Sequence, residues 1–364
     1  MKKWKKNGLV LFALLLAAAA YKPVSAVETG TAEQPAQAQE NPAPEPPKAP
    51  QTQVGIIPIV DMRGNQYSFD ASKVFQFVEN PPGGAPLLRM DEVVLEKEFK
   101  KIAEIFDVKG RDANISINTK GELVELTKEE QEILFDRKLT KADLIAKVKN
   151  GDYSPYYLSF QFGRLPKRTE EELKKINYVL AEYTTSFNAG EEKRTGNIAL
   201  GASFINGKVL MPGEEFSFLQ TAGPLSTGKG YKNAKIIQNG KFVDGIAGGA
   251  CQVSTTLFNA TLQSGLQITS RRNHSLAISY VPRGRDAAVA TGLDFRFKNN
   301  LPNPVYLQAY VHKNNLTMKV YGSVEDRKDV QISVKNTGER KYTLTRSVNG
   351  VQDQFHSSYG VKKQ

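Results

Sequence analysis

The stretch 54–165 contains short apolar runs that predict a small folded unit of mixed helices and strands. Apolar residues recurring every three or four positions predict a helix over 91–105. A second helix is predicted over 141–149, with Thr140 as its N-cap. Alternating and β-branched runs predict strands at 55–60, 67–70, 113–118, 122–126 and 156–162. The third and fourth of these strands are expected to form a hairpin.

A larger unit, 166–325, follows, with a glycine-rich stretch in its middle. Helical spacing of apolar residues predicts one helix over 168–183 and a second over 252–262. Strands are predicted at 276–281, 288–297, 304–311 and 316–321, with two or three more between 330 and 359. We therefore expect an α+β fold in which a cysteine-bearing helix packs on an antiparallel sheet. A short β-rich tail, 326–364, is expected to follow that unit.

The first 53 residues differ in composition from the rest of the chain. Basic residues precede an apolar run, 8–20, and a small-residue site ends at Ala26, which predicts a signal peptide over 1–26. The apolar run is shorter than the ~20 residues of a membrane-spanning helix. Retention of this segment as a short anchor is the alternative. Residues 27–53 are rich in Pro and Ala without apolar periodicity, which predicts a linker. We expect a secreted, extracytoplasmic protein associated with the cell wall.

Charge and motifs narrow the choice of partners. The net charge is +11, and five lysines lie within residues 1–26, so the mature chain would carry 11 − 5 = +6. A mildly basic exported protein suits an anionic wall polymer. The basic residues are scattered, so we expect no nucleic-acid partner. The stretch 223–229 resembles a phosphate-binding loop, but Gly230 stands where Ser or Thr must bind magnesium. We therefore expect no nucleotide, and the sequence indicates neither a cofactor nor a metal.

The single cysteine, Cys251, is the most informative residue for chemistry. It has no disulfide partner in the chain, so it is a buried spectator, an intermolecular partner or a reactive thiol. It lies at the start of a predicted helix, where the helix dipole lowers a thiol pKa. The backbone N–H groups of Cys251 and Gln252 could form an oxyanion hole, and Gly248 and Gly249 would let a substrate approach closely. The alternative is that the glycines cap a packed helix and Cys251 is a small apolar residue.

A histidine can reach this cysteine. Of the three histidines, His312 and His356 are expected on the surface, whereas His274 follows the cysteine helix. That helix carries the chain ~20 Å away, and residues 266–274 can span up to ~30 Å. His274 can therefore return to Cys251 as the partner of an activated nucleophile. A structural histidine is the alternative.

A carboxylate would complete the site. A hairpin centred on Gly284 would place Asp294 opposite His274, so that Asp294 could orient the imidazole. A change of one residue in the turn would place Phe295 there instead. We interpret Asp286, in that turn, as a turn-forming residue.

The residues around Cys251 resemble the VanW-like family of bacterial envelope proteins over about 184–321. The matching stretches are 197–201, 209–218, 230–231, 251–260, 274–275, 280–282, 284–287 and 294–299. The family usually carries three glycines and an isoleucine before the cysteine, whereas this chain has Ala247 and Ala250 at two of those positions. The unit 54–165 is similar to the peptidoglycan-binding module that often precedes such domains. The resemblance implies action at the cell wall, and the founding member accompanies glycopeptide-resistance genes.

Two main functions are consistent with these features. The first is a cysteine-dependent amide hydrolase or acyl transferase acting on peptidoglycan peptide. There Cys251 would attack a carbonyl, His274 would move the proton and Asp294 would orient His274. Its substrate-binding residues would be Gly248, Gly249, Gln252 and Tyr231. The second is a non-catalytic accessory that binds peptidoglycan or another wall polymer, linked to envelope maintenance or glycopeptide resistance. A redox-sensitive regulator that uses the lone thiol is a third alternative.

Overall fold

The computed structural model describes residues 53–80, 84–238 and 241–361. The predicted signal peptide and all but the last residue of the predicted linker lie outside these ranges. No helix in the described ranges is long and apolar enough to cross a membrane.

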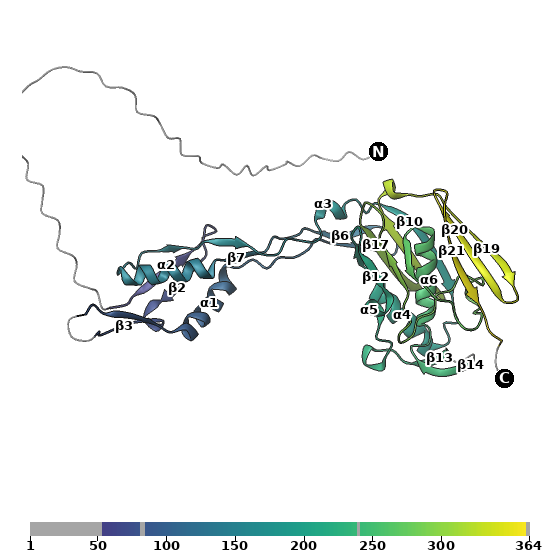
Figure 1. Cartoon of the computed structure of the whole chain (residues 1–364), viewed down its shortest axis with the longest axis horizontal. Helices are drawn as coiled ribbons and strands as arrows, with labels where there is room; N and C mark the ends of the chain where they lie inside the picture. The colour runs from purple at the N-terminus through teal and green to yellow at the C-terminus, as the bar shows by residue number, and fades with distance from the viewer. Residues whose placement is uncertain (1–52, 81–83, 239–240, 362–364) are drawn as a thin grey trace, which may run out of the picture. The chain divides into compact units, whose positions relative to one another are not determined.

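The N-terminal region packs two helices against short strands (Figure 1). Helix α1, Glu92–Phe106, begins at Asp91, whose carboxylate accepts from the Val93 and Val94 amides. Helix α2, Arg137–Lys149, begins earlier than predicted because Asp136 caps it and Thr140 lies inside it. The strands are β1 Ile56–Val60, β2 Gln66–Asp70, β3 Phe75–Val78, β4 Leu87–Met90, β7 Ile133–Phe135, β8 Tyr156–Tyr157 and β9 Phe160–Phe162. The predicted strand 156–162 is therefore two strands, of which β8 pairs with β1 and β9 with β7.

The predicted hairpin is confirmed as β5, Asn114–Ile117, and β6, Leu123–Thr127. Its turn includes Gly121 at φ +87°, a conformation that favours glycine. Buried residues of β5 join an apolar cluster with Tyr306 and Tyr321. The Gln308 side chain donates to the carbonyls at the end of β5, at 3.1 and 2.7 Å. The hairpin is therefore held by both apolar contacts and hydrogen bonds.

The predicted helix 168–183 is wrong. A short helix α3, Glu170–Leu173, is capped by Thr169, and the chain then forms strand β10, Tyr178–Ser186. Within β10, Ala181 and Thr185 are buried while their neighbours are more exposed. The aromatic and β-branched residues of this segment favour an extended conformation. Pairing with β18 in the main sheet then outweighs the helical spacing of its apolar residues.

The main sheet of the following region has the strand order β10-β18-β17-β11. Strands β17, Val305–His312, and β18, Asn315–Gly322, which correspond to the strands predicted at 304–311 and 316–321, form an antiparallel hairpin, and β11 is Lys208–Leu210. Helix α4, Glu192–Ile205, contacts β17, and helix α6, Ala250–Gln263, contacts β10 and β18.

A smaller sheet combines β12 Glu215–Ser217, β15 Gln267–Ser270 and β16 Arg296–Lys298. Helix α5 is Phe218–Ala222, and a hairpin joins β13 Asn233–Gln238 to β14 Lys241–Ile246.

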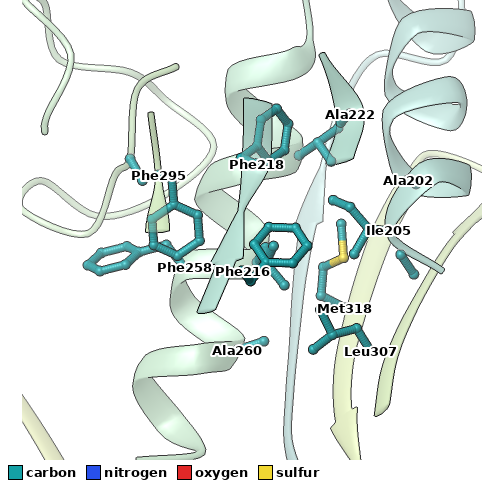
Figure 2. Close-up of a cluster of buried hydrophobic side chains, with 14 of the residues drawn as sticks. Ala202, Ile205, Phe216, Phe218, Ala222, Phe258, Ala260, Phe295, Leu307 and Met318 are labelled. Carbon is teal, nitrogen blue, oxygen red and sulfur yellow. The ribbon is translucent and has the colours of Figure 1, made fainter. Parts of the chain in front are cut away.

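The C-terminal tail is confirmed as three antiparallel strands, β19 Val330–Gly338, β20 Lys341–Val348 and β21 Val351–Ser358. Helix α6 contacts this sheet as well as the main sheet (Figure 1). The Arg346 guanidinium donates to the Leu266 carbonyl just beyond α6, at 2.7 Å. Apolar side chains from several elements meet around α6, including Phe216, Phe218, Phe258, Phe295 and Met318 (Figure 2). The structure thus confirms the α+β fold class, with α6 enclosed at its centre.

The strands predicted at 276–281 and 288–297 are wrong, apart from the residues of β16. Residues 271–293 form a long loop that contains one isolated bridge, Ala290–Leu293. Backbone groups of this loop bond to side chains of α6 instead of to a partner strand. The predicted hairpin around Gly284 is therefore absent.

Candidate active site

Cys251 lies in the first turn of α6, directly after the glycine-rich loop. Gly249, the N-cap, has φ +111°, and Ala247 has φ +63°. A Cβ on Gly248 would lie 2.6 Å from the Lys235 carbonyl oxygen, and one on Gly249 would lie 2.9 Å from Ile198 Cγ1. These glycines are therefore required by close packing of the loop against its neighbours. The Asn197 side chain fixes the same loop by donating to the Gly248 carbonyl at 3.0 Å.

Polar side chains of α6 hold the long loop against the helix. Ser254 Oγ and Thr255 Oγ1 donate to the Ala287 carbonyl at 2.6 and 3.1 Å, and the Ala287 amide donates to Thr255 Oγ1 at 3.0 Å. Asn259 donates to the Arg285 carbonyl at 2.8 Å. The thiol of Cys251 donates to the Val289 carbonyl at 3.3 Å, and the Val289 amide approaches Sγ at 3.5 Å. A buried helix rich in Ser, Thr and Asn thereby replaces a partner strand for residues 285–289.

The structure brings His274 to Cys251. Its ring lies close enough to the thiol for each group to shift the pKa of the other, and its Nδ1 lies 2.7 Å from Asp286 Oδ2. The His274 backbone amide donates to the same carboxylate oxygen, also at 2.7 Å. Because Asp286 occupies Nδ1, Nε2 is the nitrogen left for the sulfur. Cys251, His274 and Asp286 form a chain of thiol, imidazole and carboxylate.

Asp286 is fully buried and its second oxygen is also occupied. Oδ1 accepts from the Tyr359 hydroxyl at 2.6 Å and from Arg271 Nη2 at 3.2 Å. Arg271 is itself buried and also donates through Nε to the Asp286 carbonyl at 2.6 Å. The negative charge of Asp286 is therefore stabilised at both oxygens, by His274 at Oδ2 and by Arg271 and Tyr359 at Oδ1.

The surroundings of Cys251 and His274 shift the pKa of each group in the direction of its charged form. Burial alone would raise the pKa of the Cys251 thiol, but the combined effects of His274, the Val289 backbone and Arg194 outweigh it and the pKa is lowered. Burial would lower the pKa of His274, but the bond to Asp286 and the neighbouring Cys251 thiol raise it to about 9. The pKa of Asp286 is lowered against the effect of burial by its bonds to His274. A lowered thiol pKa is the property of a nucleophilic cysteine.

The predicted contact between Asp294 and His274 is wrong. Asp294 Oδ2 accepts from Ser217 Oγ at 2.6 Å and from Arg296 Nε at 2.9 Å, while Oδ1 accepts from the Leu219 amide at 2.9 Å. Without the predicted hairpin, nothing places Asp294 opposite His274. The third position belongs to Asp286, for which the sequence predicts only a turn-forming role.

Two of the predicted substrate-binding side chains are already engaged. Tyr231 is buried, and its hydroxyl donates to the Ala222 carbonyl at 2.7 Å. The Gln252 side chain donates to Thr185 Oγ1 at 3.0 Å and accepts from Arg194 at 2.6 Å. The Gln252 amide donates to the Gly249 carbonyl at 2.9 Å. Among the described residues no acceptor is bonded to the Cys251 backbone amide, so of the two predicted oxyanion donors, Cys251 and Gln252, only the Cys251 amide remains.

Sequence reasoning missed Asp286, Arg271 and Tyr359. Asp286 lies within the matching stretch 284–287, and that stretch could have drawn attention to it. Arg271 and Tyr359 carry no such signal, because their roles depend on how distant segments pack. Within the described ranges, no three His, Cys, Asp or Glu side chains are grouped as metal ligands.

The fold and site together define a domain in which a partly buried thiol at the start of a central helix lies beside a buried imidazole and a buried carboxylate of the long loop. Residues 193–321 match the family model described as VanW like protein. They include Cys251, His274 and Asp286, so all three residues of the site lie within the stretch that matches this family model. Tyr359 lies beyond the matched residues. No solved structure matches the chain significantly.

Two curated proteins are similar to this chain. An uncharacterized Bacillus subtilis protein, YoaR, is 42% identical over 160 residues, which cover 43% of this chain and 53% of that protein. The vancomycin B-type resistance protein VanW of Enterococcus faecalis is 31% identical over 135 residues, or 35% of this chain and 49% of that protein. The chain thus spans about half the length of the curated relatives it matches.

Proposed function

We propose that this chain is an extracytoplasmic cell-wall enzyme that cleaves or transfers an amide of peptidoglycan peptide through Cys251. The observation that carries the proposal is the arrangement of the site: the His274 ring lies beside the thiol and bonds through Nδ1 to the buried Asp286 carboxylate. An imidazole between a thiol and a carboxylate is the arrangement of an activated nucleophile.

The first half of the reaction uses the ion pair directly. The Cys251 thiolate attacks the carbonyl carbon, a C–S bond forms and the carbonyl electrons move to its oxygen. The Cys251 amide donates to that oxyanion. When the C–N bond breaks, the His274 imidazolium gives its proton to the departing amine. A thioester on Cys251 and a neutral His274 remain.

The second half releases the acyl group. His274 removes a proton from water or from an acceptor amine, which attacks the thioester carbonyl. The C–S bond breaks, and the thiolate and imidazolium are restored. Water as the attacking group gives a hydrolase, and an amine gives an acyl transferase. Asp286 holds the imidazole and stabilises its charged form in both halves.

The choice of peptidoglycan peptide as substrate rests on two supports. The signal peptide predicted from residues 1–26 would deliver the chain to the cell wall. The similar protein from Enterococcus faecalis is a vancomycin resistance protein by name. Resistance to an antibiotic that acts on the wall is compatible with chemistry on a wall component.

A second candidate function is a non-catalytic wall-binding accessory. The observation that favours it is the contact of Cys251 Sγ with both backbone groups of Val289. As a neutral thiol, Cys251 would help fix the loop 285–289 on α6. A thiolate cannot donate to the Val289 carbonyl, so the protonation state of Cys251 distinguishes the two functions.

Alkylation of the thiol by iodoacetamide tests the proposal, because Cys251 is the single cysteine of the chain. We expect the rate to rise at a pH below the usual thiol pKa of ~8.5. His274→Ala should shift the rise to higher pH and slow the reaction at pH 7, by about tenfold for each unit of increase in thiol pKa. Cys251→Ser should abolish the release of peptide fragments from purified peptidoglycan while leaving the circular dichroism spectrum unchanged.

The matched control is His356→Ala. His356 is exposed and bonds to Thr343, so its loss should leave the alkylation profile unchanged. A wild-type thiol with an ordinary or raised pKa that is indifferent to His274 would refute the catalytic proposal and favour the accessory.

A further inference from the structure

The C-terminal sheet supplies a side chain to the candidate active site. Tyr359 follows β21 and is buried. Its hydroxyl donates to Asp286 Oδ1 at 2.6 Å and accepts from the Gly284 amide at 2.7 Å. A residue outside the matched stretch 193–321 therefore touches the carboxylate that bonds His274.

The backbone at the end of β21 is held by two side chains from the long loop. Arg271 Nη1 donates to the His356 carbonyl at 3.1 Å, and Asn273 Nδ2 donates to the Ser358 carbonyl at 2.7 Å. Arg271 and Asn273 come just before His274 in the chain. The end of β21 is therefore attached to the segment that carries the imidazole.

A backbone hydrogen bond continues this attachment beyond Tyr359. The Gly360 amide donates to the Ser275 carbonyl at 2.7 Å, and this contact does not depend on the side chain at either position. Together the three contacts hold the chain on both sides of Tyr359 along residues 271–275. The backbone of Tyr359 is thereby fixed where its hydroxyl reaches Asp286.

The two oxygens of Asp286 have separate partners. Oδ1 accepts hydrogen bonds from Tyr359 and Arg271, while Oδ2 bonds to the backbone amide and to the ring Nδ1 of His274. Anchoring Oδ1 fixes the rotation of the carboxylate, and that rotation decides whether Oδ2 points at Nδ1. Burial and Asp286 raise the pKa of Tyr359 to about 12, so its hydroxyl stays protonated and donates at neutral pH.

We propose that Tyr359 is a positioning residue for the Cys251–His274–Asp286 site, so that this VanW-like domain needs the C-terminal sheet to hold the site in its active form. The inference rests on the proposed function of that site. Removing the hydroxyl would take one donor from a buried carboxylate and leave the buried Gly284 amide without its acceptor. Asp286 would then turn more freely and would stabilise the His274 imidazolium less.

Tyr359→Phe in the full mature chain tests the proposal, with the pH profile of Cys251 alkylation as the readout. A purely structural role would leave the thiol pKa unchanged in the folded variant. We expect alkylation at pH 7 to slow by about tenfold, which corresponds to a rise of about one unit in the thiol pKa. The titrating and charged groups that act on the thiol, His274, Arg194 and Tyr280, are unchanged in this variant.

Tyr342→Phe is the matched control. Tyr342 lies on β20, its ring centre is 6.0 Å from that of Tyr359, and its hydroxyl accepts from Arg283 at 3.0 Å. Its loss should leave the alkylation profile at the wild-type position. A Tyr359→Phe profile identical to wild type, or a shift of equal size in Tyr342→Phe, would overturn the proposal.

A measurement on the wild-type chain covers the case in which Tyr359→Phe does not fold. With tyrosine labelled by ¹³C at Cζ, the Tyr359 resonance should shift over the pH range in which His274 loses its proton. A Tyr359 resonance that is constant over that range would overturn the proposal.

The two proposals fail in different ways. If wild-type alkylation is indifferent to His274→Ala, the proposed enzymatic function fails. If it depends on His274 but not on Tyr359, only the positioning role fails.

Discussion

At the residue scale, the position of one carboxylate decides how the site is assembled. Asp286 joins the start of the long loop 271–293 to Tyr359 near the C-terminus, because it bonds His274, Arg271 and Tyr359. A buried carboxylate without such partners would be protonated or would destabilise the fold. Here its pKa is lowered, so it remains charged at neutral pH and stabilises the imidazolium.

Substituting Asp286 therefore has a predictable effect on the thiol. Asp286→Asn removes the negative charge beside His274, so the His274 pKa should fall and the Cys251 pKa should rise. Alkylation at pH 7 should slow by about tenfold or more, as a rise of one or more pKa units requires. The variant should also unfold at lower urea, because Arg271 is left as a buried charge, at a cost of about 3–5 kcal/mol.

Asp294→Asn is the control for that substitution. Asp294 is the carboxylate predicted from the sequence, and an asparagine Oδ1 can still accept from the Leu219 amide. Its Arg296 partner is 39% exposed in its side chain, so the lost ion pair is screened by solvent. The alkylation profile should stay at the wild-type position. A larger effect of Asp294→Asn than of Asp286→Asn would contradict the assignment of Asp286 to the site.

At the element scale, the position of Cys251 and the fold class could be predicted from the sequence, whereas the loop could not. The glycine-rich stretch and the helix that follows it carry local signals, and α6 begins close to its predicted start. Residues 271–293 contain apolar and β-branched runs that favour strands. Their hydrogen bonds go instead to Ser254, Thr255 and Asn259 on α6. No local sequence pattern shows whether the backbone of such a segment will bond to a neighbouring strand or to polar side chains of a helix.

The same limit explains the error at 168–183. Apolar residues there fit a period of three to four, but Ala181 and Thr185 also fit the spacing of inward positions along a strand. The contact between Thr185 and Thr256, at 2.8 Å, joins this strand to α6. The sequence of 168–183 is therefore compatible with both a helix and a strand, and only the tertiary contacts select the strand.

Removing one hydroxyl, that of Thr255, tests how the loop 271–293 is attached to α6. Thr255→Val keeps the shape of the side chain but leaves the buried Ala287 amide without its acceptor. We expect a loss of about 1–3 kcal/mol in the free energy of unfolding. Urea denaturation followed by circular dichroism measures it.

Thr261→Val is the matched control on the same helix. Its hydroxyl bonds only to the Phe258 carbonyl one turn earlier among the described residues, so no loop group loses a partner. The loss should stay below about 1 kcal/mol. Equal losses in the two variants would mean that the hydroxyl of Thr255 does not hold the loop.

At the scale of the whole molecule, the described residues contain separate apolar cores. One core includes Phe99 on α1 and Leu144 on α2, and another includes Leu257 and Phe258 on α6. The two cores share no residue, and a third, smaller cluster involves the β5–β6 hairpin. The chemistry proposed for Cys251 would belong to the α6 core, while wall binding is predicted for residues 54–165. The two activities should therefore be separable by substitutions in the two cores.

Phe99→Ala should disable the N-terminal core without affecting the thiol. Phe99 is 1% exposed, so its truncation should cost about 3–5 kcal/mol in that core. The first core should then melt at lower temperature in calorimetry, and co-sedimentation of the mature chain with purified peptidoglycan should be lost once it has melted. The alkylation profile of Cys251 should remain that of wild type at the same temperature.

Leu257→Ala should have the opposite effect: it should weaken the core around α6 and leave the N-terminal core folded. Leu257 is also 1% exposed but lies on α6, so its truncation should cost about 2–5 kcal/mol in the core that holds Cys251. Above the melting temperature of that core the thiol should react at the rate of a free cysteine, with a pKa near ~8.5. Sedimentation with peptidoglycan should persist as long as the N-terminal core stays folded. If both variants lose binding and the low thiol pKa together, the two regions act as one unit and the assignment of wall binding to residues 54–165 is wrong.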